Sequence, residues 1–225
     1  MLTTYDDINI EIDEKQVYRY LGYGAGHRRS ARTSSIINEY IENAHHLIEA
    51  SYSYVTRDIE RVRRSCVFVE GSIMFRSEVI AGLLEQCCCV SVFIATIGSR
   101  LEETVLKLAE ERLVLQSAVL DAIGSAAVDG LAGLVQAKIA EEAGNKGLCI
   151  SQRFSPGYCD WTIRQQEAVF RIIGENSNGV SLTEGYLMIP RKSISGVIGI
   201  GLSSSSVMKY NPCKTCGKQD CRGRR

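Results

Sequence analysis

Residues 147–202 organise the chain, and they read GLCISQRFSPGYCDWTIRQQEAVFRIIGENSNGVSLTEGYLMIPRKSISGVIGIGL. Leu148 to Gln152 has the composition of a short strand. Pro156-Gly157 then imposes a turn, because proline fixes φ and glycine adopts angles closed to other residues. The sequence therefore predicts a bend just after Arg153, with exposed backbone groups and a guanidinium whose donors suit a carboxylate. A plain surface turn with a solvated arginine is the alternative.

The elements around this bend predict an α/β fold of the α+β kind, with a mixed, largely antiparallel sheet and packed helices. Ser53 to Phe75 is strand-rich, and Cys88 to Ala95 is a continuous apolar run typical of a central strand buried on both faces. After the bend, Val180 to Ile189 and Ser193 to Leu202 are predicted as an antiparallel pair turned at residues 190–192. Helices are predicted at Glu14 to Leu21, Ser34 or Ser35 to about Ala50, Ser77 to about Gln86, Ser99 to Ala143 as two helices meeting between Glu111 and Ser117, and after Asp160 or Thr162.

Composition narrows the class of protein. The 225 residues are 45% hydrophobic and carry 26 basic and 26 acidic side chains, so neither a nucleic acid nor an anionic membrane is an expected partner. The acidic N-terminus has no apolar signal-peptide core, and the apolar runs are too short or too broken to cross a bilayer. Nine cysteines in such a chain favour a cytoplasmic location, with free thiols, a metal site or both. The cysteine triplet 87–89 is interpreted as small buried side chains.

Two motifs in this stretch resemble a known family. Residues 153–158, RFSPGY, match an RxxPGY signature, while Leu182-Thr183-Glu184, Met188-x-Pro190 and Ser193-Ile194-Ser195-Gly196 match a second signature in the same order. Both are similar to the S-adenosylmethionine-binding activation domain of cobalamin-dependent methionine synthase. The resemblance implies that domain's fold and a loop that binds S-adenosylmethionine.

Asp129 is a further candidate from the residues themselves. It lies on the flank of a helix face left bare by glycine, serine and alanine, where a carboxylate could accept hydrogen bonds from an amine-bearing ligand. Its place relative to Arg153 resembles that of an acidic residue in the family's pocket, where a glutamate is expected; a solvated helix charge is the alternative. With the resemblance, the candidate ligand-binding residues are Arg153, Phe154, Pro156, Gly157, Tyr158, Asp129, Glu184, Ser195 and Tyr210.

The resemblance also implies a reaction. In the family, an inactive Co(II) corrinoid takes one electron from a flavodoxin- or ferredoxin-like donor and a methyl group from S-adenosylmethionine. The chain would position these groups rather than perform acid–base chemistry, as a protein associated with methyl transfer. The sequence lacks an Asp-x-His-x-x-Gly segment, so the cobalamin is expected on a partner methionine synthase or other corrinoid protein. The surface around Tyr158 and Trp161 is the expected docking place.

The last residues suggest a second site. Cys213, Cys216 and Cys221 form a C-x₂-C-x₄-C pattern, in which two thiolates two residues apart can bind one ion. Zinc, an iron–sulfur cluster and a cobalt-facing thiolate are all open, as is a tail of redox-active thiols. The fourth ligand would come from Cys159, the triplet 87–89, a partner or solvent. A competing function is therefore a non-catalytic module that handles metal or corrinoid through these cysteines.

Three parts of the chain are predicted. Residues 1–50 form an N-terminal helical segment, 51–205 an α/β body similar to the activation domain, and 206–225 the cysteine-rich tail.

Overall fold

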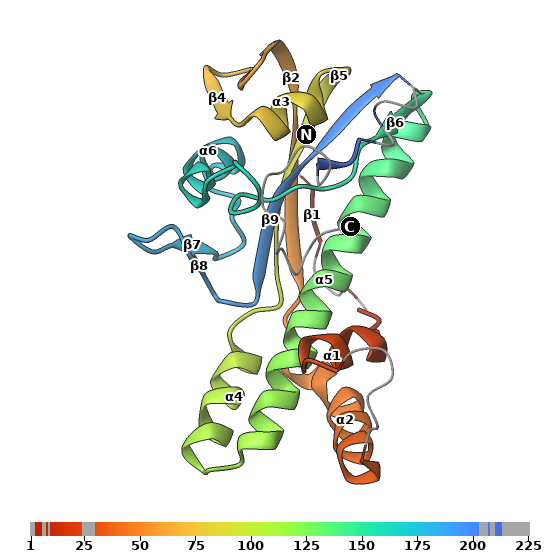
Figure 1. Ribbon diagram of the computed structural model, residues 1–225, viewed down its shortest axis with the longest axis vertical. Helices are drawn as coiled ribbons and strands as arrows, with labels where there is room; N and C mark the ends of the chain where they lie inside the picture. The colour runs from red at the N-terminus through yellow and green to blue at the C-terminus, as the bar shows by residue number, and fades with distance from the viewer. Residues whose placement is uncertain are drawn as a thin grey trace.

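The computed structural model describes residues 3–5, 8, 10–23, 30–202, 207 and 210–212 (Figure 1). Along the chain the strands are β1 Thr3–Tyr5, β2 Ser51–Arg63, β3 Cys66–Val69, β4 Ile73–Arg76, β5 Cys87–Thr96, β6 Leu148–Ile150, β7 Ser181–Leu182, β8 Met188–Ile189 and β9 Ser193–Leu202. The helices are α1 Glu14–Tyr20, α2 Ala31–Ala44, α3 Glu78–Leu84, α4 Arg100–Glu110, α5 Val114–Gly144 and α6 Gln166–Ile173, with 3₁₀ turns η1 His45–Leu47 and η2 Ile163–Gln165.

One curled sheet forms the centre of the molecule. Its strands run in the order β4-β3-β2-β5-β9-β6, with β1 also paired to β2. Each pairing among the described strands is antiparallel. β2 is long enough to pair with β5 through its first eight residues and with β3 through its last five, and Figure 1 shows the sheet bending along it. The predicted α+β class is confirmed, and the sheet that the described strands form is antiparallel rather than mixed.

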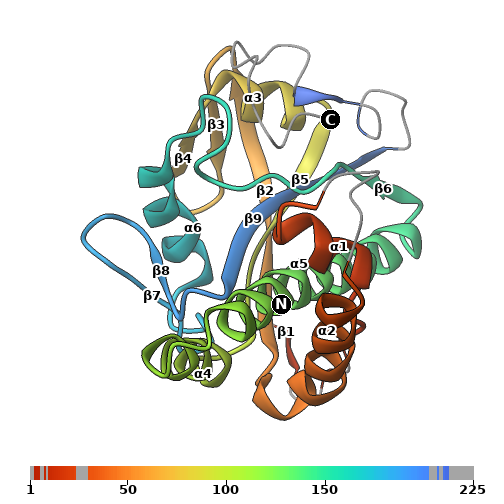
Figure 2. The same ribbon diagram turned by 60° about the horizontal axis from the view of Figure 1, so that its bottom comes forward.

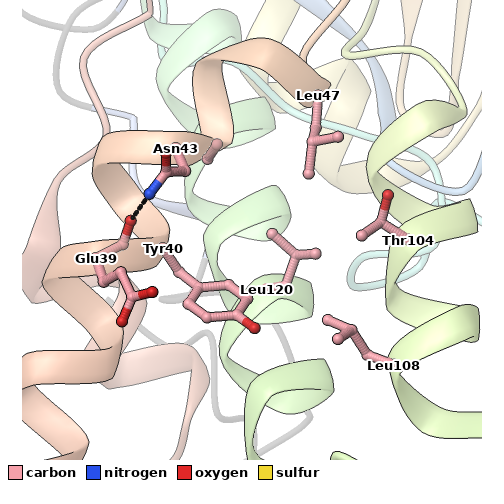
Figure 3. A pocket seen from close by; sticks show the side chains of 8 residues that line it. Glu39, Tyr40, Asn43, Leu47, Thr104, Leu108 and Leu120 are labelled. Atoms are coloured by element: carbon pink, nitrogen blue, oxygen red, sulfur yellow. Dashed lines mark hydrogen bonds between the residues drawn. The ribbon is translucent and has the colours of Figure 1, made fainter. Parts of the chain in front are cut away.

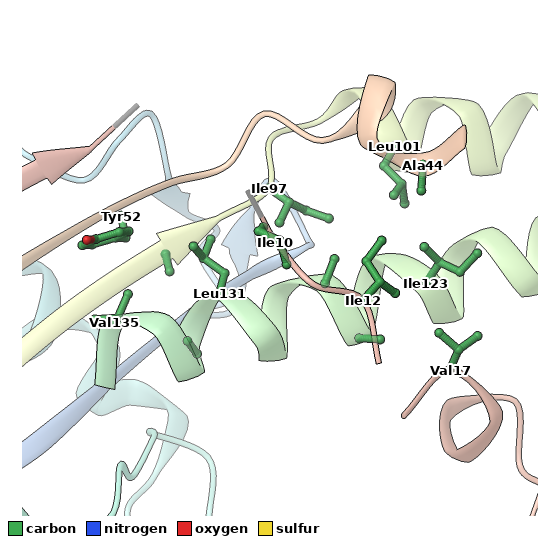
Figure 4. Close-up of a cluster of buried hydrophobic side chains, with 14 of the residues drawn as sticks. Ile10, Ile12, Val17, Ala44, Tyr52, Ile97, Leu101, Ile123, Leu131 and Val135 are labelled. Atoms are coloured by element: carbon green, nitrogen blue, oxygen red, sulfur yellow. The ribbon is translucent and has the colours of Figure 1, made fainter. Parts of the chain in front are cut away.

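Helices cover both faces of this sheet. Side chains alternate along β5, so that Phe93 and Ala95 join the core under α5, whereas Val92 and Ile94 join the core under α3 and α6. Figure 4 shows the first core, in which residues from the N-terminal segment pack between the sheet and α5. Figure 2 shows α5 lying across the sheet, with α1 and α2 beside it.

Helix α5 is the longest helix packed on this face of the sheet and contributes many residues to the first core. It is 31 residues long, and among the described helices it alone is long and apolar enough to span a bilayer by those two criteria. More than half of its most apolar window is buried inside the fold, which is typical of a core helix. A Cβ on Gly130 would lie 3.1 Å from the backbone oxygen of Glu11, so the bare face of α5 lets the N-terminal segment approach closely.

Several predicted elements are confirmed. β5 is a central strand between β2 and β9, and α4 and α5 meet within the predicted interval. The hydroxyl of Ser77 accepts a hydrogen bond from the N–H of Ile80, so it caps α3 as expected.

Other predictions are wrong, each for a tertiary reason. Residues 180–189 are not the partner of β9, because β7 and β8 pair with each other and β9 lies between β5 and β6. Helix α2 begins after Ser30, whose hydroxyl accepts from Thr33, rather than at Ser34 or Ser35. Of the cysteine triplet, Cys87 is buried but Cys88 is exposed.

The predicted cap at Asp160 belongs to a different helix. Its carboxylate accepts from the hydroxyl of Ser77 at 2.6 Å and from the N–H of Glu78 at 2.5 Å, at the start of α3. The segment that follows Asp160 begins instead with η2, whose N-cap residue Thr162 makes no capping hydrogen bond with its side chain.

Candidate functional site

The two sequence motifs lie side by side. After β6 the chain continues along the edge of β9, where the N–H of Phe154 donates to the oxygen of Val197 at 3.0 Å and the N–H of Val197 donates back at 2.8 Å. Gly196 makes this approach possible, because a Cβ there would lie 2.7 Å from the backbone oxygen of Phe154. The RFSPGY loop is thereby fixed to the strand that carries the second motif.

The predicted bend is confirmed. Pro156 is buried, and Gly157 follows with φ +98°, in the region that favours glycine. The N–H of Gly157 donates to the oxygen of Trp161 at 2.7 Å and closes the turn.

Successive residues of this edge segment face opposite sides of the sheet. The ring of Phe154 packs against Tyr158 and Trp161, with centroids 6.2 Å and 6.3 Å away, in the core under α3 and α6. Trp161 is 0% exposed, so the expectation that it contributes to a docking surface is wrong; Tyr158, at 57% exposed, is accessible.

Arg153 points the other way, to α5. Its Nη2 donates to Oδ1 of Asp129 at 2.9 Å, and Tyr20 of α1 donates its hydroxyl to Oδ2 of the same carboxylate at 2.8 Å. Arg19 lies 3.8 Å from Oδ2. We call Arg19, Tyr20, Asp129 and Arg153 the carboxylate cluster. The structure thus joins two of the predicted residues, Asp129 and Arg153.

The carboxylate cluster is suited to an anion. Two guanidinium groups and one carboxylate leave it with one net positive charge. The side chain of Arg153 is 23% exposed, and its remaining N–H donors have no hydrogen-bond partner in the described part of the chain. Partial burial lowers the local dielectric and strengthens the attraction for a carboxylate. Gly133, one turn along α5 from Asp129, has open space where its Cβ would be.

Burial and the hydrogen bond to Asp129 raise the pKa of Tyr20 above 10.0, so its hydroxyl stays protonated and acts as a donor. Sequence reasoning missed Tyr20 and Arg19. The contact between Tyr20 and Asp129 joins residues 109 positions apart, and no local pattern marks it.

Three other candidates lie elsewhere. Ser195 is 1% exposed, and its hydroxyl donates to Oε1 of Gln166 at 2.6 Å, so it ties β9 to α6. Glu184 is exposed on the turn between β7 and β8. Figure 1 shows these two strands on the side of β9 opposite to α5. Tyr210 lies against α3, where its hydroxyl is 2.7 Å from the position of a Cβ on Gly82. A ligand role for these three stays a prediction.

The predicted metal ligands Cys213, Cys216 and Cys221 lie outside the described residues. Within the described ranges, no group of three or more His, Cys, Asp or Glu side chains is placed to hold a metal ion. Burial raises the pKa of Cys87 to about 12, so this thiol is a poor nucleophile at neutral pH.

A cavity of about 220 Å³ lies between α2, α4 and α5 (Figure 3). Its lining is mainly apolar, with Leu47, Leu108 and Leu120 around Tyr40. Leu120 and Asp129 are nine residues apart on α5, which is about 13 Å along the helix axis. The cavity is therefore separate from the carboxylate cluster and holds none of its charged groups.

These features define a class of protein: an α+β domain with a curled antiparallel sheet, one long helix across one face, and a charged cluster where an edge loop meets that helix. Among solved structures, this class includes a crystal structure described as the MetH reactivation domain bound to AdoHcy. The two folds superpose with a TM-score of 0.71 over 91% of this chain and 79% of that chain. Sequence identity is 13%, so the likeness establishes the fold, and the fold that the two motifs predicted is confirmed. No protein-family model and no curated protein sequence matches the chain.

Proposed function

We propose that this chain binds S-adenosylmethionine at the carboxylate cluster and supports reductive methylation of a corrinoid carried by a partner, a cobalamin-dependent methionine synthase or a related corrinoid protein. The observation that carries the proposal is the Arg153–Asp129 pair, presented by the RFSPGY loop at the edge of β9. The fold's likeness to a reactivation domain bound to AdoHcy, the demethylated product of S-adenosylmethionine, supports it.

The residues fit such a ligand. The amino-acid end of S-adenosylmethionine carries a carboxylate, for which the Arg153 donors that do not bond to Asp129 form a matching fork. It also carries an ammonium group, and the oxygens of Asp129 retain lone pairs beyond the two that Arg153 and Tyr20 use. The turn uses the N–H of Gly157 and the C=O of Tyr158, so the exposed backbone there offers the C=O of Gly157 and the N–H of Tyr158 to a planar base.

The chain's part in the reaction is positioning. The bound sulfonium supplies an already activated methyl group, so no general base is needed beside it. Arg153 orients the amino-acid end, Asp129 holds Arg153, and the rigid contact at Gly196 fixes the loop. A flavodoxin- or ferredoxin-like protein in the cytoplasm would supply the electron that the corrinoid needs.

Titration calorimetry with S-adenosylmethionine tests the proposal. Arg153→Ala should weaken binding by roughly 10- to 100-fold, the effect of losing charge-assisted hydrogen bonds to a carboxylate. Arg171→Ala is the matched control, because Arg171 is an exposed arginine on α6. Failure of the unmodified protein to bind, or equal affinities for the two variants, would refute the proposal.

The C-terminal cysteines support a second proposal, a metal site in the tail. The last described residues hold the chain against the body, since Val207 is buried and Tyr210 packs on Gly82 of α3. Cys213 directly follows this anchored segment, and the C-x₂-C-x₄-C spacing suits thiolate binding of zinc or an iron–sulfur cluster. Metal analysis of Cys213→Ser beside a Cys66→Ser control tests it, and equal metal content in both would exclude the site.

A further inference from the structure

Helix α1 is fixed against α5 next to the carboxylate cluster. Val17 is 0% exposed and Tyr18 is 3% exposed, and both belong to the core that α5 covers. Figure 4 shows Ile12 and Val17 beside Ile123 of α5. The position of α1 is therefore set by packing, and its last turn reaches Asp129 from a fixed direction.

The end of α1 presents two groups to the carboxylate of Asp129. The hydroxyl of Tyr20 makes the shorter contact, at 2.8 Å to Oδ2. The guanidinium of Arg19 lies 3.8 Å from the same oxygen and 5.4 Å from the ring centroid of Tyr20. Because Arg19 is 60% exposed, water and salt screen its charge, and Tyr20 is the stronger partner.

The two carboxylate oxygens of Asp129 accept hydrogen bonds from two different side chains. Oδ2 accepts from Tyr20, and Oδ1 accepts from Arg153. A carboxylate held on one side by a fixed hydroxyl cannot rotate freely, so its other oxygen has a defined direction. A long arginine side chain loses rotamer entropy when it is ordered, and a fixed acceptor removes part of that loss before a ligand arrives.

We propose that Tyr20 is a positioning residue of the binding site, which acts through Asp129 to orient the Arg153 guanidinium toward the carboxylate of the ligand. This inference rests on the proposed function and adds to it a contribution from helix α1. Tyr20 reaches Arg153 only through the carboxylate of Asp129, so it acts on the amino-acid end of the proposed ligand. Its effect is therefore confined to ligands that carry a carboxylate.

That restriction separates positioning from a merely structural role. If Tyr20 only helped α1 to pack, its loss would disturb the site as a whole and weaken every ligand. If it acts through Arg153, only the carboxylate interaction weakens. S-adenosylhomocysteine and 5′-methylthioadenosine are a suitable pair of probes, since both carry the nucleoside and sulfur but only the first has the amino-acid end.

The experiment measures the Kd of both probes by calorimetry on the full chain and on Tyr20→Phe, which removes only the hydroxyl. We expect the Kd for S-adenosylhomocysteine to rise about fivefold, as for loss of one hydrogen bond to a partly exposed charged group, and that for 5′-methylthioadenosine to stay unchanged. In an Arg153→Ala background, Tyr20→Phe should have no further effect, because the residue it orients is gone. Tyr40→Phe, at the separate helix cavity, is the matched control and should bind both probes normally.

Any result that differs from these expectations contradicts the inference. Equal weakening of both probes in Tyr20→Phe assigns the residue a structural role, and unchanged affinities show that it does not orient Arg153. Either outcome leaves the proposed function standing, because the unmodified protein still binds. If the unmodified protein binds neither probe, the proposed function and this inference both fail. Because Tyr20 is 44% exposed, its substitution should leave the unfolding midpoint unchanged, which thermal denaturation checks.

Discussion

Replacement of Gly196 by alanine tests the contact that joins the two motifs. A Cβ at this position would lie 2.7 Å from the backbone oxygen of Phe154, 3.0 Å from Cε1 of Phe93 and 3.1 Å from Oγ of Ser155. The first neighbour is backbone, and the second is a core ring that is 0% exposed. Neither can move away freely, so the added methyl group must push the RFSPGY loop off the edge of β9.

The expected cost has two parts. Overpacking in a well-packed region destabilises by about 1–3 kcal/mol. Displacement of the loop also weakens the two backbone hydrogen bonds between Phe154 and Val197, which adds about 1 kcal/mol in total. We therefore expect Gly196→Ala to lower the free energy of unfolding by about 2–4 kcal/mol, and to weaken S-adenosylmethionine binding because Arg153 follows the displaced loop.

Urea denaturation followed by circular dichroism measures the first effect, and calorimetry measures the second. With a slope near 2 kcal/mol/M, the midpoint should fall by about 1–2 M. Gly144→Ala is the matched control, because a Cβ there meets nothing within 4 Å and alanine favours a helix. A loss below about 0.5 kcal/mol in Gly196→Ala, with normal binding, would show that the glycine is not needed for the contact.

Three further predictions concern Asp160 and the cysteines of β5. Asp160→Ala removes the carboxylate that accepts hydrogen bonds at the start of α3, and it should lower the free energy of unfolding in urea by about 1–2 kcal/mol. Asp160→Asn keeps an acceptor and should lower it less. Equal effects of the two substitutions would contradict a capping role for Asp160. Burial raises the pKa of Cys87 from 9.0 to about 12, so the thiol keeps its proton to a higher pH in the native state than in the unfolded state. The free energy of unfolding should therefore fall as the pH rises from 9 towards 12. This fall should be less steep in Cys87→Ala. At pH 8, iodoacetamide followed by mass spectrometry should label exposed Cys88 well before Cys87, and equal rates would contradict the burial argument.

Local patterns predicted many elements of this fold correctly. The apolar run 88–95 became the central strand, and the Pro156-Gly157 turn formed where the chain had to bend. The two motifs predicted a fold that the structure confirms at 13% sequence identity to its solved counterpart. The strand and the turn depend on residues close together in the sequence, whose steric preferences act without the rest of the chain, whereas the fold was implied by the resemblance that the motifs carry.

The pairing of β9 is a feature that local sequence patterns did not predict. Residues 180–189 are adjacent to β9 in sequence and have strand-like composition, so a hairpin was the expected arrangement. In the structure β9 is instead flanked by β5 and β6, from about 100 and 50 residues earlier, and β7 and β8 form a separate hairpin. Strand composition indicates that a partner is needed but does not identify it, because any complementary apolar edge satisfies the same hydrogen bonds.

The sequence by itself determined the bend after Arg153, the bare face of α5 around Asp129 and the presence of both motifs. Only the tertiary structure decided that Arg153 and Asp129 meet, that Tyr20 completes their contact, and that Asp160 caps α3 rather than the segment that follows it. The physical reason is the range of the interactions. Turns and helix faces follow from neighbouring residues, whereas these contacts join side chains 24 to 109 positions apart and exist only once the sheet and α5 have packed.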